Sequence, residues 1–328
     1  MVKSSPAGHR PALFWKVIGL SGLLLLGSCN TAPRSLNPKD VPDESECAPL
    51  TPVVAPKGYA VLPEAVLAAD SLLARTFSAD ALRTANVCGL VPQLRAMLAT
   101  APGTLARVVA RQQVSSRLTD VALEISSTAG ELDCEEERAD QIADFLLDEA
   151  GSRVKNLTIL AILLGALGTV ATGLMSLFDV RKTIYRPVGI AIGLIGAALG
   201  YSSLRTSAAA DIPFSHRRNA LGDVWRGPTE STVFPAAVWN FLSRPGIRGA
   251  NQPPLRQRLL GRWLTAGELG AKDADEKQQL EDLLFGAGGT YKADALRIRA
   301  NLFDQLESTV NLMKSDVQQL AREVAEVE

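Results

Sequence analysis

Two runs of sequence without a charged side chain constrain this chain more than any other feature. The first extends from Asn156 to Phe178 and the second from Pro187 to Leu204, and they hold 23 and 18 residues. At 1.5 Å per residue, helices of these lengths cross the hydrocarbon core of a bilayer, about 30 Å thick, fully and barely, respectively. Because backbone amides in lipid must bond internally, two helices are the direct interpretation. We predict a two-helix transmembrane hairpin over residues 156–204.

The charges around the hairpin predict its orientation. The connecting turn contains Arg181, Lys182 and Arg186, and a basic excess favours the cytoplasmic side. An exported amino terminus followed by two spans returns the carboxyl terminus to the exported side. Both soluble regions are then expected in one compartment. A soluble protein with two buried apolar helices is the alternative.

Small residues recur in both runs at spacings that let helix backbones approach closely. The simplest interpretation is that the two spans pack against each other. A second interpretation is that they also pack against other copies, because the layout resembles outer-membrane lipoproteins that carry a glycine-zipper hairpin and oligomerise. This resemblance concerns layout alone and assigns no function to any residue. The helix-packing candidates are Gly165, Gly168, Gly189, Gly193, Gly196 and Gly200.

The amino terminus has the pattern of a secretory signal. A basic start leads into the apolar stretch Val17 to Leu26, which is too short to span a bilayer comfortably. Leu26, Gly27, Ser28 and Cys29 then resemble the lipobox of bacterial lipoprotein precursors. The resemblance implies that residues 1–28 are removed and that Cys29 is diacylated. Two acyl chains anchor a protein stably in a membrane. An uncleaved anchor is the alternative.

The overall composition is close to neutral, with 35 acidic against 34 basic side chains, 47% apolar residues and 21% charged residues. Loss of the signal removes Lys3, Arg10 and Lys16, which leaves 31 basic against 35 acidic side chains. Such a balance argues against nucleic acid as a partner, since phosphate binding requires a basic face. Only two histidines occur in the chain, which gives little support for a polyhistidine metal site.

Residues 29–62 are predicted to be a proline-rich tether. Six prolines and few large apolar residues favour extended polyproline geometry, and at about 3.1 Å per residue the segment reaches on the order of 100 Å. The alternative is that the part around Tyr59 to Leu62 lies as a strand on the domain that follows.

Two helical segments are expected outside the membrane. Residues 63–155 are predicted to form a helical domain, with a helix restarted at Pro92 and a long helix that leads into the first span. Residues 266–328 are predicted to form carboxyl-terminal helices that pack on 63–155.

Each long helix carries an apolar seam at helical spacing. The first seam, within residues 118–150, is interrupted only by Glu136, and the second, within residues 296–327, only by Arg299. Small residues dominate the first seam and larger ones the second, which favours antiparallel packing. The predicted fold is an all-α membrane protein, a two-helix transmembrane hairpin joined to an antiparallel, coiled-coil-like helical bundle. Self-association through either seam is the alternative.

The cysteines predict one disulfide in an exported, oxidising compartment. Cys88 and Cys134 lie on successive predicted helices that fold back on each other across Pro102, so we expect these two to pair. Cys47 is then left over in the tether, although its pairing with either of the others stays open.

The segment 205–265 differs from the rest because it combines aromatic residues with prolines. Loops of this kind concentrate binding, and they also form compact packing beside a bilayer. Both interpretations stay open. The partner-binding candidates are Trp225, Arg226, Phe234, Trp239 and Phe241.

Residues that carry chemistry are few. After signal removal the only histidine is His216, and a surface position near the membrane is the simplest account of it. An acidic stripe on the long helix is expected to be a solvated flank, although it would also attract a cation or a basic partner. No CxxC pair or phosphate loop occurs, so we predict no enzyme, no metal and no cofactor besides the lipid on Cys29. The stripe consists of Asp133, Glu137, Asp140, Asp144 and Asp148.

The sequence therefore favours a lipoprotein of the bacterial cell envelope with a structural, scaffold or assembly role. The alternative is an oligomeric channel or an accessory subunit of an envelope transport or secretion system. The expected partners are the lipid bilayer, an envelope protein and further copies of the chain. Both soluble regions are expected on the exported, periplasmic side. Asn30 and the two apolar spans give conflicting indications of inner or outer membrane.

Overall fold

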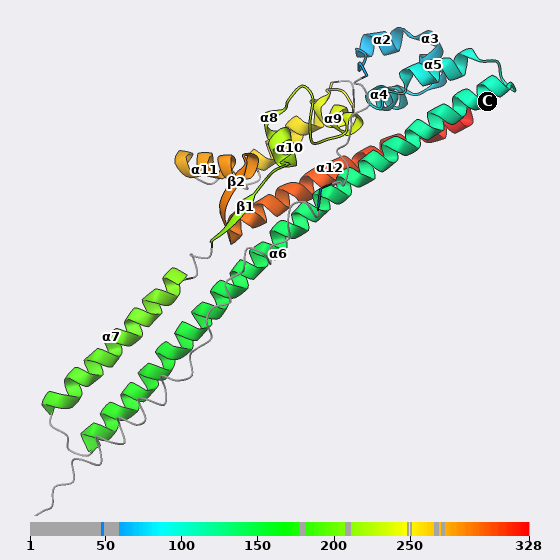
Figure 1. Cartoon of the computed structure of the whole chain (residues 1–328). Coiled ribbons are helices and arrows are strands. Elements are labelled where there is room, and N and C mark those ends of the chain that lie inside the picture. The colour runs from blue at the N-terminus through cyan, green and yellow to red at the C-terminus, as the bar shows by residue number, and fades with distance from the viewer. Residues whose placement is uncertain are drawn as a thin grey trace, which may run out of the picture. The chain divides into compact units, whose positions relative to one another are not determined.

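Figure 1 shows a mostly helical chain with one small sheet. The computed structural model describes residues 47–48, 59–177, 182–206, 211–247, 249, 251–265, 269 and 273–327, all within one unit, Val41–Glu328. The elements are α2 (Glu64–Ala69), α3 (Ser71–Thr76), α4 (Ala79–Val87), α5 (Val91–Ala99), α6 (Leu105–Leu177), α7 (Lys182–Thr206), β1 (Asp211–Ser215), α8 (Ala220–Arg226), α9 (Ala236–Ser243), α10 (Leu255–Thr265), α11 (Ala274–Phe285), β2 (Gly288–Lys292) and α12 (Ala293–Glu326).

Polar residues at the helix starts explain where several short helices begin. The side chains of Asp70, Ser78 and Asp273 each accept a hydrogen bond from a backbone amide in the first turn of α3, α4 and α11, respectively. Pro92 lies in the first turn of α5. Backbone amides in the first turn have no acceptor within the helix, so the amide hydrogen that proline lacks costs no hydrogen bond there. The predicted restart at Pro92 is therefore confirmed.

Helix α6 is the longest element and runs without interruption through Gly130 and Gly151. Its 73 residues correspond to about 110 Å at the standard helical rise. One continuous helix therefore joins the amino-terminal helical domain to the first apolar run.

The main core lies between α6 and α12, which pack side by side and antiparallel (Figure 1). Contacts near both ends define the direction, since Arg111 bonds to the backbone oxygen of Ala325 and Arg297 pairs with Asp144. The seam buries larger side chains of α12 against smaller ones of α6. Among them are Leu118, Ile125, Ala139, Ala143, Phe303, Leu306, Val310, Met313 and Leu320, all less than 8% exposed.

Strands β1 and β2 form a two-stranded antiparallel sheet that the sequence did not predict. Phe214 pairs with Gly289, and Ser215 pairs with Gly288, which has a positive φ of 89°. A side chain on Gly288 would collide with the backbone oxygen of Phe214, so glycine is required there. The sheet brings Phe214 and His216 against α6 and α12.

The carboxyl-terminal half of α6 differs from the rest of the helix because its apolar side chains are exposed. It contains a stretch long and apolar enough to cross a membrane, and only 6% of that window is buried within the chain. Helix α7 packs along it (Figure 1), and its apolar part, Gly189–Ser202, is shorter than a full span. Among the described residues, α6 is the one helix that meets the length criterion.

Candidate functional site

The apolar ends of α6 and α7 form the surface that most sets this chain apart. Large apolar side chains project outward from both helices, for example Leu163 at 52% and Leu194 at 67% exposure. The hydroxyl groups of Thr172 and Ser202 donate to backbone oxygens four residues earlier in their own helices, at 2.8 Å in each case. These two hydroxyl groups are thus satisfied within their own helices, while the large apolar side chains face outward.

The predicted helix-packing glycines divide into two groups. A Cβ atom on Gly168 would lie 2.5 Å from Cγ2 of Ile192, and one on Gly189 would lie 3.4 Å from Thr172. These two glycines therefore sit where α6 and α7 approach each other. A Cβ atom on Gly165, Gly193, Gly196 or Gly200 would meet nothing within 4 Å.

The cysteine pairing differs from the prediction. The disulfide joins Cys47 to Cys134, and Cys88 is a free, fully buried thiol. The predicted Cys88–Cys134 bridge is therefore wrong. Cys88 packs inside the helical domain at the end of α4, and this burial raises the pKa of its thiol to about 12.

The proline-rich segment is consequently held at two points rather than being a free tether up to residue 62. Cys47 is bonded to α6, and the residues from Tyr59 onward lie on α4. Tyr59 donates to the backbone oxygen of Val87, and Asn86 exchanges two hydrogen bonds with the backbone of Leu62. The alternative in which this part lies on the domain is correct in placement, although the residues form no strand. The proposed lipidation site, Cys29, lies outside the described residues.

Three of the five predicted partner-binding residues are buried. Phe234, Trp239 and Phe241 are at most 4% exposed, and Phe234 stacks on Trp239 with ring centroids 5.6 Å apart. Trp239 also donates from Nε1 to the backbone oxygen of Pro228. These three residues form the core of this segment, so of the two interpretations left open by the sequence, compact packing describes them.

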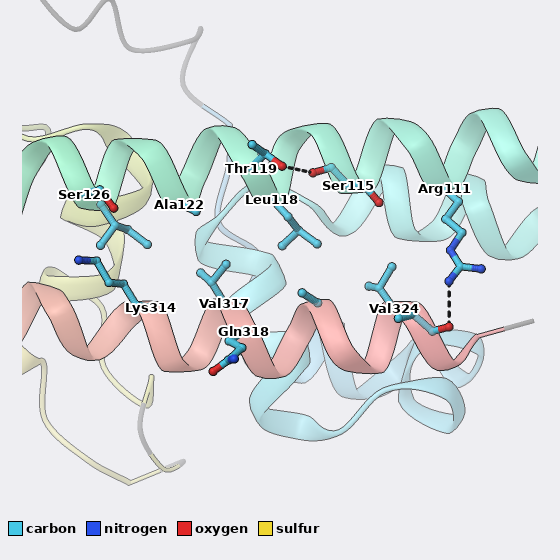
Figure 2. A pocket seen from close by; sticks show the side chains of 13 residues that line it. Arg111, Ser115, Leu118, Thr119, Ala122, Ser126, Lys314, Val317, Gln318 and Val324 are labelled. Carbon is cyan, nitrogen blue, oxygen red and sulfur yellow. Dashed lines mark hydrogen bonds between the residues drawn. The ribbon is translucent and has the colours of Figure 1, made fainter.

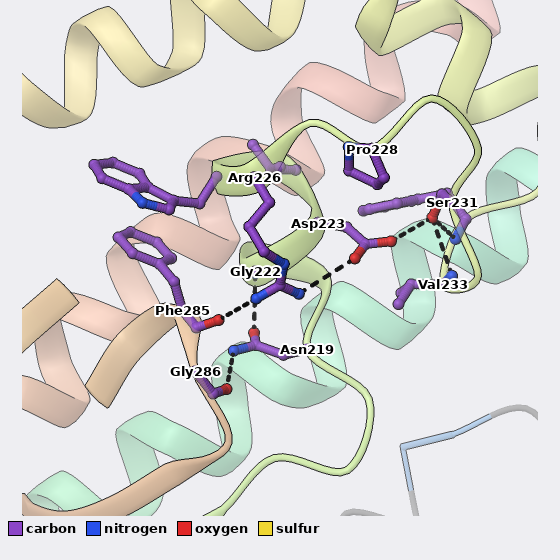
Figure 3. Close-up of polar contacts among 12 residues, drawn as sticks. Asn219, Gly222, Asp223, Arg226, Pro228, Ser231, Val233, Phe285 and Gly286 are labelled. Atoms are coloured by element: carbon purple, nitrogen blue, oxygen red, sulfur yellow. Dashed lines mark hydrogen bonds and ion pairs between the residues drawn. The ribbon is translucent and has the colours of Figure 1, made fainter. Parts of the chain in front are cut away.

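The other two predicted residues, Trp225 and Arg226, remain accessible but make internal contacts. The ring of half-buried Trp225 stacks on Phe285 at 4.2 Å. Arg226 donates to the backbone oxygen of Phe285 at 2.7 Å and lies 3.4 Å from Asp223, whose other carboxylate oxygen accepts from Ser231 (Figure 3). This network joins α8 to the end of α11.

A buried cluster of charges surrounds His216, which is 6% exposed rather than at the surface as expected. Arg138 lies over the Phe214 ring at 4.2 Å and pairs with Glu135 at 3.0 Å. Arg299 is fully buried, donates to the backbone oxygen of Leu284 and lies 3.7 Å from Glu135. The cluster therefore links α6, β1 and α12.

The protonation state of His216 follows from its neighbours. Tyr291 donates its hydroxyl proton to the backbone oxygen of Leu283, so it accepts from His216 Nε2 at 2.8 Å. Burial, followed by the charges of Arg299 and Arg138, lowers the pKa of His216 to about 2. A neutral imidazole fixed in this way is a structural group.

Carboxylates gather at one position of the α6–α12 seam. Oxygen atoms of Asp133, Glu136 and Glu307 lie within 4.8 Å of one another, a donor set of the type that hard cations accept. Burial raises the pKa of Glu136 to about 7, and the nearby carboxylates of Asp304 and Glu307 add to this effect. Glu136, the single exception in the first apolar seam, is thus at the centre of a repulsive cluster.

The sequence contained a signal for the buried charges but not for their arrangement. Arg299 was the single interruption in the second seam, which marks a buried or functional charge. Its partner Glu135 lies one residue before Glu136 and is therefore not a member of the apolar seam, so the seam pattern gives no indication that Glu135 is buried.

Comparison with known proteins adds no relative: no family model, no curated protein and no solved structure matches this chain.

Proposed function

We propose that this chain is a membrane-embedded bacterial lipoprotein with a structural, scaffold or assembly role in the cell envelope. The carrying observation is the packing of α12 against the polar half of α6. The polar half of α6 precedes the apolar segments in the chain, and α12 follows them. Because these two parts pack against each other, they must be on the same side of any membrane that α6 enters. A single span would separate them, whereas a second span by α7 reunites them.

The exposure of the apolar side chains supports insertion of both helices. A helix in water buries its leucine and isoleucine side chains, whereas a helix in lipid leaves many of them facing outward. The many exposed leucine and isoleucine side chains of α6 and α7 therefore favour a hydrocarbon environment. Helix α7 covers one side of the α6 span and leaves the rest open to lipid. At 25 residues, α7 is also long enough as a whole, although its uncharged part is shorter.

The disulfide supports export of the soluble part. A bond between Cys47 and Cys134 persists in an oxidising compartment and is rare in the cytosol. Export agrees with the lipobox at Leu26 to Cys29, which in this proposal provides a second anchor. The proposed location is the exported face of an envelope membrane.

A fractionation experiment with two independent lesions tests this proposal. Cys29→Ala removes the lipid, and lysines in place of Leu163 and Leu167, which are 52% and 50% exposed, disable the span. We expect each lesion alone to leave the protein in the membrane fraction after alkaline extraction, and both together to release it. The control is Leu123→Lys, an exposed leucine (63%) in the polar half of α6.

Release of the protein by Cys29→Ala alone would contradict the hairpin. Retention of the doubly altered protein would contradict the two-anchor proposal, provided that circular dichroism shows it to be folded.

The outward-facing glycines favour one further role, that of an oligomeric channel or an accessory subunit of an envelope transport system. Gly165 and Gly193 have open space where a side chain would stand, so a second copy can approach closely there. The mass of the purified protein in lipid nanodiscs tests this role. A mass that corresponds to a monomer would contradict the oligomeric channel.

A further inference from the structure

The two sides of the α6–α12 pair differ in what covers them. On one side lie β1, α9 and α10, where Arg218 pairs with Glu131 of α6 at 2.7 Å and Arg262 of α10 donates to the hydroxyl group of Thr309 of α12. Side chains two positions apart on a helix point about 200° away from each other. Asp133 and Glu307, two positions from Glu131 and Thr309, therefore project from the opposite side of the pair.

This opposite side is rich in carboxylates, and we call it the acidic face. Among its described residues, one ion pair occurs, between Asp144 and Arg297 at 2.7 Å. The carboxylate of Glu135, which is covered, pairs with Arg138 instead. The negative charge of the acidic face is thus largely uncompensated within the described chain. Its carboxylates belong to Asp133, Glu136, Glu137, Asp140, Asp144, Asp148, Asp304 and Glu307.

The acidic face is bounded at the end away from the apolar hairpin. Ser126 and Lys314 lie two helical turns from Asp133 and Glu307, respectively, and so on the same side of the pair. They line an open groove, which Figure 2 shows between α6 and α12. No side chain that lines this groove carries a carboxylate. The acidic face therefore extends along α6 from residue 133 to residue 148, about 22 Å.

The complementary charge lies in the layer that covers the other side. Residues 231–265 include α9 and α10 and contain five arginines and no carboxylate, and we call them the arginine-rich segment. Arg244, Arg258 and Arg262 are exposed. Within the described part of the chain, neither Arg244 nor Arg258 forms an ion pair. This segment therefore presents positive charge to the surroundings.

Both surfaces lie at one level along the helix pair. Arg262 contacts Thr309, which is two residues from Glu307 in the acidic face. A second copy placed beside the first can therefore bring opposite charges together without a shift along the helix axis. A basic partner of another kind would need to match this level by itself, whereas a second copy matches it by construction.

We propose that copies of this chain associate side by side, with the arginine-rich segment of one copy against the acidic face of the next. The two surfaces differ, so the contact is heterologous and repeats around an axis parallel to the helix pair. Opposite charges select this contact and disfavour the pairing of like surfaces. The inference does not depend on the proposed membrane anchors, because both surfaces belong to the soluble part of the chain.

Carbodiimide cross-linking of the full chain in detergent tests the proposal. Arg258→Lys retains the charge and supplies the amine that the reagent joins to a carboxylate. We expect mass spectrometry to find cross-links from residue 258 to Asp133, Glu137 or Glu307. In a mixture of isotopically light and heavy protein, these cross-links should join light to heavy chains, because the two surfaces of one copy face apart. A rise in salt from about 50 mM to about 500 mM should lower their yield several-fold.

Reversal of either surface tests whether the charges direct the contact. Arg258→Glu with Arg262→Glu, and separately Asp133→Lys with Glu137→Lys, should each weaken association in sedimentation experiments at least tenfold. An equimolar mixture of the two double variants should restore it, because each reversed surface then meets an opposite charge. If circular dichroism shows the first variant to be unfolded, Arg258→Glu alone replaces it.

The matched control is Arg75→Glu with Arg322→Glu, two exposed arginines outside both surfaces. This variant has the same net charge as the first double variant and should associate as the unaltered protein does. Three outcomes would overturn the proposal. They are an absence of light-to-heavy cross-links between residue 258 and the acidic face, an equal loss of association in the control, and no recovery in the mixture.

Discussion

Arg299 of α12 and Glu135 of α6 meet inside the helix pair, with Nη2 of the arginine 3.7 Å from Oε2 of the glutamate and side-chain exposures of 0% and 8%. Arg138 shares the same carboxylate oxygen at 3.0 Å. One buried carboxylate thus serves two guanidinium groups. Removal of a partner from such a group leaves a buried charge without compensation, which costs more than the pair contributes.

The two substitutions that break this contact should therefore differ in effect. Arg299→Met leaves Glu135 paired with Arg138, whereas Glu135→Met removes the buried carboxylate that both guanidinium groups share. We expect Glu135→Met to lower the free energy of unfolding by about 3–5 kcal/mol and Arg299→Met to lower it by clearly less. Urea titration followed by tryptophan fluorescence measures both. Equal losses would show that the three charges do not act as a unit.

His216 should make the protein sensitive to acid. Its pKa is about 2 in the folded chain and 6.5 in the unfolded chain, so only the unfolded chain takes up the proton between these values. Stability is complete above pH 6.5 and declines below it by about 1.4 kcal/mol per pH unit, or about 2 kcal/mol at pH 5. Unfolding curves at pH 7.5 and pH 5 test this. His216→Gln should remove most of the difference, and an unchanged pH dependence in this variant would contradict the assignment.

The disulfide should constrain the unfolded chain strongly, because it joins residues 87 positions apart. The entropy of such a loop corresponds to at most about 4–5 kcal/mol. We expect Cys47→Ser and Cys134→Ser to destabilise the protein equally and their combination to add nothing. Thiol titration of the unfolded, unreduced protein should find Cys88 reactive and the other two blocked. A reactive Cys134 with a blocked Cys88 would contradict the pairing.

Gly168 should tolerate less change than Gly165, three residues earlier on the same helix. A methyl group on Gly168 would lie 2.5 Å from Ile192, whereas one on Gly165 would meet nothing within 4 Å. We expect Gly168→Ala to destabilise the pairing of α6 and α7, while Gly165→Ala is neutral or stabilises the helix by up to about 1 kcal/mol. Unfolding in sodium dodecyl sulfate, followed by circular dichroism, measures this. Ile192→Ala should relieve the effect of Gly168→Ala, and failure to do so would place the clash elsewhere.

Glu136 should weaken the helix pair at neutral and higher pH. The folded chain raises its pKa from 4.5 to about 7, so it holds a proton that the unfolded chain has lost, and stability falls as the pH rises from 4.5 to 7. Glu136→Gln should raise the free energy of unfolding at pH 8 by up to about 1 kcal/mol after solvent screening, and should have no effect at pH 4. Asp120→Asn, an exposed carboxylate on the same helix, is the control. A stabilisation by both variants would indicate a general charge effect.

Much of the helical architecture was predictable because it depends on local spacing. Three features could be read from residues close together in the chain. They are the apolar seams of α6 and α12, the long uncharged run in α6 and the restart of a helix at Pro92. Such patterns are decided by the helical period and by which face avoids water, and both are properties of neighbouring residues.

The contacts between distant residues needed the tertiary structure. The partner of Cys134 depends on which cysteine the folded chain brings within bonding distance, and burial of Cys88 removed the candidate nearer in sequence. The five partner-binding candidates lie in one segment rich in aromatic residues and prolines. Packing nevertheless buried Phe234, Trp239 and Phe241 and left Arg226 exposed. Sequence spacing by itself determined the helices, their apolar faces and the expectation of lipid. Tertiary packing decided the disulfide, the charge cluster around Glu135 and the placement of the arginine-rich segment opposite the acidic face, because each relates groups whose separation along the chain says nothing of their separation in space.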